Sequence, residues 1–177
     1  MPQFLGAAFI QSIVLDLNAL KQSGAFKRAG TGQGNAREIR HAVRRDEVFW
    51  LEEVVANLVQ QQLWAQINGL KQAFNRVLYL GLREFEGHYA SYPKGGFYKK
   101  HTDSFQRDPA RVVSLIIYLN EAWQAKDGGL LRIYAHGQTT DIAPIAGTLV
   151  CFLSHELEHE VLLSHKRRLS FSGWFKL

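Results

Sequence analysis

The chain has 177 residues, of which 46% are hydrophobic and 21% are charged, and its formal net charge is +5. This length suits one domain with a sizeable core, and the apolar fraction excludes an intrinsically disordered chain. The one cysteine, Cys151, has no partner for an internal disulfide, which excludes a disulfide-stabilised secreted scaffold. The basic residues form short clusters, which favours solvated faces over a nucleic-acid-binding stripe.

The N-terminal segment 4–22 has apolar residues at helical spacing, and we predict a helix with one buried face there. It lacks a basic start, and Gln11, Ser12 and Asp16 interrupt its apolar residues. We therefore expect neither an export signal nor a membrane span, and we expect a cytoplasmic protein.

The next segment combines a loop with a second helix. Residues 24–36 contain four glycines and predict a loop. Residues 46–53 lead into a helical region, which we place at about 58–78 because its apolar residues recur at helical spacing.

The rest of the chain has a sequence pattern typical of β-strands. After Gly81, eight short runs rich in β-branched and aromatic residues are separated by turn residues. This order predicts an α+β fold, a double-stranded β-helix (jelly-roll) barrel with N-terminal helices packed on one sheet. We expect a single domain over residues 1–177, with its helical part at about 1–80 and its barrel at about 81–177.

Residues 155–165 read "HELEHEVLLSH", which matches most of the zinc-peptidase string H-E-x-x-H-x-x-G-x-x-H. That string requires a helix, because only helical spacing puts residues four apart on one face. Here strand-like runs precede and follow it, and Leu162 stands where the string needs glycine. A bulky residue resists the positive φ of that turn. We therefore reject a zinc peptidase, and Glu156 loses its catalytic role.

A second set of metal-binding side chains lies upstream. His101 and Asp103 are separated by one residue, and alternate residues of a strand share a face. With a histidine from a distant strand, which we expect to face them from across the barrel, they would form the two-histidine, one-carboxylate triad of non-haem Fe(II) oxygenases.

Arg168 opens the last predicted strand nine residues after His159. Strand alternation puts it on one face with Ser170, Ser172 and Trp174. An arginine that faces inward needs an anionic partner, because an unpaired buried charge is costly. A bound carboxylate is one candidate, and a core acid of the chain itself is the alternative.

These features resemble the 2-oxoglutarate- and Fe(II)-dependent prolyl hydroxylases, specifically the oxygen-sensing branch and its bacterial relatives. The resemblance covers about residues 35–177. It rests on "RRDEVFWLE", "YPKGGFYKKHTD", "RVVSLIIYLN", "WQAKDGGLLRIY", "HEV" and the last strand, in a consistent order. It implies that His101, Asp103 and His159 are the iron ligands. His155, the rival of His159, then falls in a turn or at the rim of the site.

The resemblance also implies roles around the iron. Arg168 would bind the distal carboxylate of 2-oxoglutarate with help from Tyr118, while Tyr92, Tyr98 and Trp174 would line the pocket. The histidines without a place in this pattern, and two further tyrosines, are interpreted as structural: His41, His88, His136, His165, Tyr89 and Tyr134.

Three residues fall on the substrate side of this pattern. Arg111 would lie at the substrate mouth. Arg44 and Asp46 match a stretch that is usually Arg-Gly-Asp, with Arg45 in place of the glycine. The glycine-rich loop would be the counterpart of the family's mobile loop, which closes over the target proline. As a hypothesis, Asp46 and Arg111 pair to hold this closure.

The activity that the resemblance implies is hydroxylation of a prolyl residue in a protein to trans-4-hydroxyproline. Fe(II), 2-oxoglutarate and O₂ would be required, succinate and CO₂ would be released, and ascorbate is a candidate stimulant. Bacterial relatives act on elongation factor Tu, which makes that acidic protein the leading candidate substrate.

Two alternatives stay open at this point. One is a 2-oxoglutarate oxygenase that acts on a nucleobase or a free amino acid, and the other is a non-catalytic barrel that serves as a binding module. We expect no membrane partner and no nucleic-acid partner, and the sequence leaves the oligomeric state open.

Overall fold

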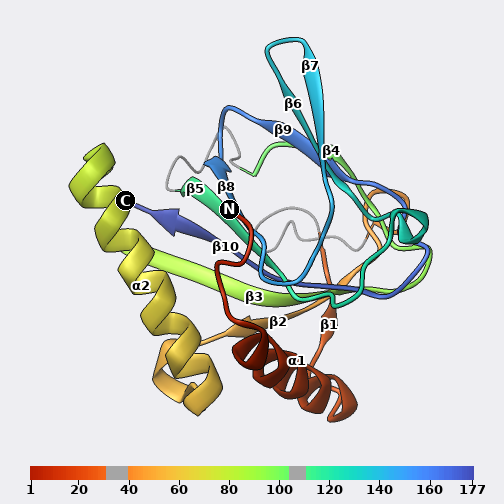
Figure 1. The fold of residues 1–177 in the computed structure, drawn as a ribbon, viewed down its shortest axis with the longest axis horizontal. Helices are drawn as coiled ribbons and strands as arrows, with labels where there is room; N and C mark the ends of the chain where they lie inside the picture. Colours follow the sequence, from red (N-terminus) through yellow and green to blue (C-terminus); the bar gives the residue numbers. More distant parts are fainter. Residues whose placement is uncertain (31–39, 104–110) are drawn as a thin grey trace.

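Two antiparallel β-sheets and two α-helices make up the part of the chain that the computed structural model describes, residues 1–30, 40–103 and 111–177 (Figure 1). The larger sheet has the strand order β1-β2-β3-β10-β5-β8 and the smaller sheet has the order β4-β9-β6-β7. The predicted jelly-roll barrel with helices packed on one sheet is confirmed. Residues 31–39, most of the predicted loop, lie outside the described part.

The element bounds follow the predicted runs closely after residue 81. The larger sheet consists of β1 (Lys27–Arg28), β2 (Glu47–Leu51), β3 (Glu84–Tyr92), β10 (Arg168–Lys176), β5 (Arg111–Tyr118) and β8 (Leu149–Leu153). The smaller sheet consists of β4 (Tyr98–His101), β9 (Glu158–Val161), β6 (Leu131–Ala135) and β7 (Gln138–Ile142). The helices are α1 (Ala7–Gln22), η2 (Glu53–Val55), α2 (Leu58–Leu78) and η3 (Ala125–Asp127).

Both predicted α-helices are present, and α1 begins three residues later than predicted. The start of α2 is set by Asn57, whose side chain accepts from the backbone N–H of Gln60 at 3.0 Å, while the Gln60 side chain accepts from Asn57 N–H. This reciprocal cap satisfies two N–H groups that the first turn of a helix leaves unpaired. None of the helices in the described part is long and apolar enough to span a membrane.

The N-terminal region also supplies two strands that the sequence did not predict. Residues 47–51 form β2, which pairs with β3, and Lys27–Arg28 form β1, which pairs with β2. Within the stretch 46–53, which we expected to lead directly into the helix, residues 47–51 therefore extend the larger sheet before η2 leads into α2. A strand this short is stabilised chiefly by the neighbour it pairs with, so its local sequence says little.

The main core lies between the two α-helices and the outer face of the larger sheet (Figure 1). On β10 the alternation is as predicted: Leu169, Phe171 and Phe175 pack in this core, whereas Arg168 and Trp174 line the cavity between the sheets. The helices therefore hold one face of the larger sheet rigid, and its other face is free to carry polar and aromatic groups.

Asp16, which interrupts the apolar face of α1, connects three elements. Its carboxylate accepts from the side chains of Asn57 and Gln60 at the start of α2, at 2.6 and 2.9 Å, and from the Tyr89 hydroxyl of β3 at 3.0 Å. This polar junction fixes how α1 and α2 sit against the sheet.

Candidate metal centre and active-site pocket

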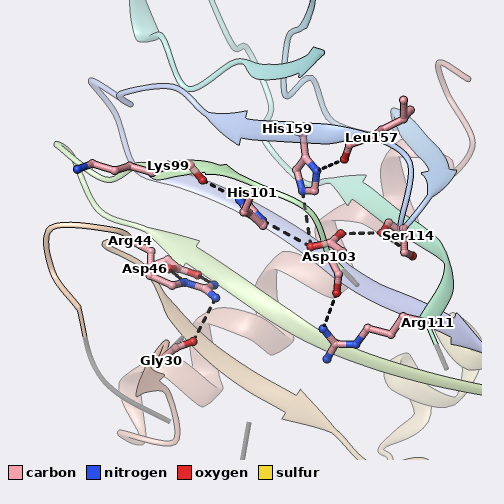
Figure 2. Close-up of polar contacts among 11 residues, drawn as sticks. Gly30, Arg44, Asp46, Lys99, His101, Asp103, Arg111, Ser114, Leu157 and His159 are labelled. Carbon is pink, nitrogen blue, oxygen red and sulfur yellow. Dashed lines mark hydrogen bonds and ion pairs between the residues drawn. The ribbon is translucent and has the colours of Figure 1, made fainter. Parts of the chain in front are cut away.

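A cavity of about 210 Å³ lies between the two sheets. Within it, potential ligand atoms of His101, Asp103 and His159 all lie within 4.8 Å of one another. The Nε2 atoms of the two histidines are 3.5 and 3.6 Å from Oδ1 of Asp103, and Figure 2 shows the three side chains pointing toward one another. Among the described residues this is the one group of three or more such side chains that could hold a metal ion.

The two histidines come from neighbouring strands. His101 is the last residue of β4, and its direct cross-strand partner is His159 on β9. The expectation that His159 faces His101 from across the barrel is therefore wrong. The order of strands in the smaller sheet decides this placement, because chain positions 58 residues apart become adjacent only through pairing.

Asp103 reaches the centre in a different way from the one predicted. It lies in a bend two residues after the end of β4, so strand alternation does not place it beside His101. Its Oδ2 instead accepts a hydrogen bond of 2.6 Å from Ser114 on β5 of the larger sheet. The Ser114 hydroxyl is in turn 2.9 Å from that of Ser154, and both serines are buried.

Backbone carbonyl groups orient both imidazole rings. His101 Nδ1 is 2.7 Å from the carbonyl oxygen of Lys99, and His159 Nδ1 is 3.1 Å from that of Leu157 (Figure 2). Since a carbonyl oxygen can only accept, each Nδ1 carries the hydrogen. Each Nε2 then keeps its lone pair, which is the arrangement that a metal-binding histidine needs.

The charges of the three groups also suit a divalent cation. Burial alone would raise the pKa of Asp103, but the adjacent imidazoles of His101 and His159 and the hydrogen bond from the Ser114 hydroxyl hold it well below its usual range. Burial lowers the pKa of His159, against the opposing effect of Asp103. A charged carboxylate beside a neutral imidazole is the protonation state in which these groups bind metal.

Arg168 lies at the inner end of the pocket with 1% of its surface exposed. Its Nε donates to the carbonyl oxygen of Gly129 at 2.9 Å, and its guanidinium carbon lies 5.1 and 5.0 Å from the ring centroids of Tyr92 and Tyr118. Gly129 has φ +63°, and a Cβ there would lie 3.1 Å from Arg168 Cδ, so this approach requires glycine.

No carboxylate in the described part of the chain forms an ion pair with Arg168, and the buried Tyr118 hydroxyl has no hydrogen-bond partner there. The alternative of a core acid is therefore not supported. Burial raises the pKa of Tyr118 to about 12, against the opposing charge of Arg168, so the hydroxyl stays a donor. A guanidinium without a carboxylate partner, beside the buried Tyr118 hydroxyl, fits a bound carboxylate such as the distal group of 2-oxoglutarate.

The structure brings most of the other predicted site residues to this cavity. Its lining includes Tyr92, Tyr98, Trp174, Arg111 and Arg44. Asp46 is not part of this lining, and Tyr118 lies directly behind it, against Arg168 at the inner end of the cavity.

The hypothesis that Asp46 pairs with Arg111 is wrong. Asp46 accepts two hydrogen bonds from Arg44, at 2.7 and 2.5 Å, and its side chain is fully buried. Arg111 pairs instead with Glu86 on β3, at 2.6 Å between Nη2 and Oε1, and its guanidinium carbon lies 3.7 Å from the ring centroid of Trp174. Each charge therefore has a nearer partner than the one proposed.

His88, interpreted from the sequence as a structural residue, lines the pocket. Its ring lies 4.7 Å from that of Trp50 and 5.5 Å from that of Trp174. Burial, together with the positive charges of Arg44 and Arg111, lowers its pKa to about 3, so the imidazole is neutral. Strand alternation could have found it, because His88 is four residues before Tyr92 on β3. His155, by contrast, lies in the predicted turn with 60% of its side chain exposed.

Comparison with known proteins agrees with this geometry. The model of the 2OG-Fe(II) oxygenase superfamily matches residues 87–176, which is half of the chain. The chain belongs to this superfamily. The oxygenase therefore requires Fe(II), 2-oxoglutarate and O₂, and the predicted enzyme class is confirmed.

The relatives that resemble the oxygenase include several prolyl hydroxylases. It is 28% identical over 189 residues to prolyl hydroxylase EGLN3 of Mus musculus, and the alignment covers 99% of this chain and 76% of that protein. Its fold matches a Pseudomonas putida prolyl-4-hydroxylase with a TM-score of 0.89 and 38% identity, over 99% of this chain and 90% of the other. A prolyl hydroxylase of Trichoplax adhaerens, in complex with a peptide fragment of hypoxia inducible factor, matches with a TM-score of 0.88 and 26% identity. That match covers 99% of this chain and 81% of the other. The oxygenase is thus a member of the prolyl hydroxylase family.

Proposed function

We propose that this oxygenase hydroxylates a prolyl residue of a protein to trans-4-hydroxyproline, and that elongation factor Tu is its leading candidate substrate. The observation that carries the reaction is one pocket that joins a His–Asp–His cluster to a buried arginine without a carboxylate partner in the described part of the chain. The relatives that are prolyl hydroxylases support the choice of a prolyl substrate.

In this proposal each group at the inner end of the pocket has one role. His101, Asp103 and His159 hold Fe(II), and Arg168 with Tyr118 binds the distal carboxylate of 2-oxoglutarate. Iron, 2-oxoglutarate and O₂ together supply the oxidising chemistry, with succinate and CO₂ as products. The chain orients the co-substrate and excludes water, because Arg168, Tyr118 and His159 are all buried.

The outer part of the pocket offers a wall for the prolyl ring. Trp50 is 41% exposed, and behind it lie His88 and Trp174, whose rings are stacked at an interplanar angle of 29°. Arg111 covers Trp174 and is itself held by Glu86. Flat aromatic faces pack well against the saturated ring of proline, and a neutral His88 adds no charge to this wall.

Elongation factor Tu is proposed on two grounds. Bacterial relatives in the family that the sequence resembles act on it, and a net charge of +5 suits an acidic protein partner. The Trichoplax adhaerens relative was solved with a peptide, which supports a protein substrate over a nucleobase or a free amino acid. We also propose a cytoplasmic location and a single domain over residues 1–177, the latter because both helices share one core with the larger sheet.

The test is hydroxylation of a defined proline. Purified protein is incubated with Fe(II), 2-oxoglutarate and either elongation factor Tu or peptides that span its prolines, and mass spectrometry looks for a proline heavier by one oxygen atom. Succinate release that depends on the protein substrate, and disappears when the target proline is replaced by alanine, is the expected result. Modification of other prolyl proteins but never elongation factor Tu would remove only that candidate, whereas turnover stimulated by a nucleobase or a free amino acid would reject the prolyl reaction.

A further inference from the structure

Residues 43–45, just before β2, are hydrogen-bonded to β4, the strand that ends at His101. The N–H of Arg45 donates to the carbonyl oxygen of Phe97, and the N–H of Lys99 donates to that of Val43, both at 2.9 Å. Arg44 forms a β-bridge with Tyr98 between these two bonds. Residues 43–45 therefore extend the edge of the smaller sheet, and Asp46 follows them directly.

Arg44 lies between two partners on this edge. It donates two hydrogen bonds to Asp46, and its guanidinium carbon lies 4.2 Å from the ring centroid of Tyr98 (Figure 2 shows the Arg44–Asp46 pair). The Arg44 side chain is 14% exposed and that of Asp46 is fully buried. Burial alone would lower the pKa of Arg44, but its bonds to Asp46 raise it well above the usual value. A planar cation fixed on one edge by a carboxylate holds an aromatic ring against its face.

Tyr98 contacts Arg44 on one side and His101, a predicted iron ligand, on the other. Its ring is stacked on that of His101, with 3.6 Å between the centroids and an interplanar angle of 21°. Residues three apart on a strand normally face opposite ways, but the pairing with β9 shifts here: Tyr98 is opposite Val161, and His101 is opposite His159. A bulge therefore brings Tyr98 and His101 to the same face.

We propose that Arg44 and Asp46 are positioning residues of the metal centre, which act through Tyr98 to fix the plane of the His101 ring. The stack restrains the ring face, and the Lys99 carbonyl oxygen, held by the bond from Lys99 N–H to Val43, restrains its rotation. The same segment, residues 43–46, thus supports both restraints. This role differs from the substrate-binding role that the resemblance suggests for Arg44 and Asp46.

His101 needs this support more than His159 does. The His101 side chain is 18% exposed, against 5% for His159, whose ring also packs edge-on against Phe152 with the centroids 4.7 Å apart. Asp103 is held by Ser114 on the opposite sheet. The ligand nearest to solvent is therefore the one that the Arg44–Tyr98 contact holds.

The test measures metal affinity directly and needs no substrate. Metal-free protein is titrated with Co(II), and binding is followed by its visible absorption spectrum. We expect Tyr98→Leu, which removes the ring, and the paired change Arg44→Gln with Asp46→Asn, which removes both charges, to weaken Co(II) binding by about 10- to 100-fold and to alter the spectrum. Tyr98→Phe keeps the ring and should bind within about 2-fold of wild type. The paired change leaves no buried unpaired charge, so the protein should fold, which circular dichroism checks.

Arg132→Gln is the matched control. Arg132 donates two hydrogen bonds of 2.8 Å to Asp141, a pair of similar geometry on the solvent-exposed β6–β7 hairpin. Loss of the Arg132–Asp141 pair should leave Co(II) affinity unchanged.

Unchanged Co(II) affinity in folded Tyr98→Leu or in the folded paired variant would overturn the proposal. A higher KM for the protein substrate with normal Co(II) affinity would do the same, since it would assign these residues to substrate binding. The inference rests on the metal centre and not on the prolyl substrate, so failure of the hydroxylation test would leave this result standing.

Discussion

The two sheets of this oxygenase contribute differently: the larger sheet carries the main core on one face and part of the pocket on the other, whereas the smaller sheet supplies the two histidines of the metal cluster. The larger sheet has its outer face packed against α1 and α2, and its strands keep regular pairing over as many as nine residues. The smaller sheet supplies both histidines of the metal cluster, and its pairing is interrupted by a bulge between Tyr98 and His101. The outer edge of the smaller sheet is β7, whose residues are mostly exposed (Figure 1). Strands β3 and β10, which carry much of the main core, pair regularly along their whole length, whereas the pairing of β4 with β9 shifts where the two histidines converge.

Replacing a histidine of the smaller sheet should have the largest effect on activity. We expect His159→Ala to reduce succinate formation to background, because a site with two remaining ligands holds Fe(II) poorly. Thermal unfolding should change little, since the residue lies in the pocket and not in the main core. The control is His155→Ala, four residues away and exposed, which should keep full turnover. If His155→Ala were inactive and His159→Ala active, the ligand assignment would be wrong.

A change in the larger sheet should have the largest effect on stability. Phe171 is 1% exposed and packs with Phe85 and Tyr89 in the main core. We expect Phe171→Ala to lower the free energy of unfolding by about 3–5 kcal/mol, as measured by denaturant titration. Below its lower melting temperature the variant should still bind Co(II). A loss below about 1 kcal/mol would show that the larger sheet is not the main source of stability.

His88 lets the pH dependence of stability be tested on the pocket side of the larger sheet. Its pKa falls from 6.5 to about 3 on folding, so between these values the unfolded chain binds a proton that the native state does not. The free energy of unfolding is therefore unaffected by protonation of His88 above a pH of about 6.5, and it decreases as the pH falls below that value. Between pH 7 and pH 5 the loss should be about 2 kcal/mol, and His88→Met should remove it. Equal losses in both proteins, measured by urea unfolding, would contradict the burial of a neutral imidazole.

The smallest effect is expected on the exposed side of the smaller sheet. Arg132 and Asp141 form a bidentate pair, but both side chains are about one-third exposed. We expect Arg132→Gln to leave the free energy of unfolding almost unchanged, because water and salt screen such exposed pairs. A large loss would mean that the hairpin contributes to stability as the larger sheet does, and the two sheets would not differ in this way.

Local patterns predicted most of the elements. Helical spacing located α2, and of the ten strands in the described ranges, eight coincide with runs of β-branched and aromatic residues. The strand alternation that put Arg168 and Trp174 on one face also holds. The missed strand β2 has only five residues, and it is a strand because β3 lies beside it.

The sequence by itself determined the order of helices and strands, the inward face of the last strand and the residue types that a 2-oxoglutarate oxygenase needs, because these depend on short-range periodicity and on motifs. Tertiary structure alone decided which strands are neighbours, that a bend delivers Asp103, and that Asp46 pairs with Arg44 while Arg111 pairs with Glu86. The physical reason is that pairing partners and ion pairs are chosen by distance in space, which a bulge or a bend of one residue can change without any local trace in the sequence.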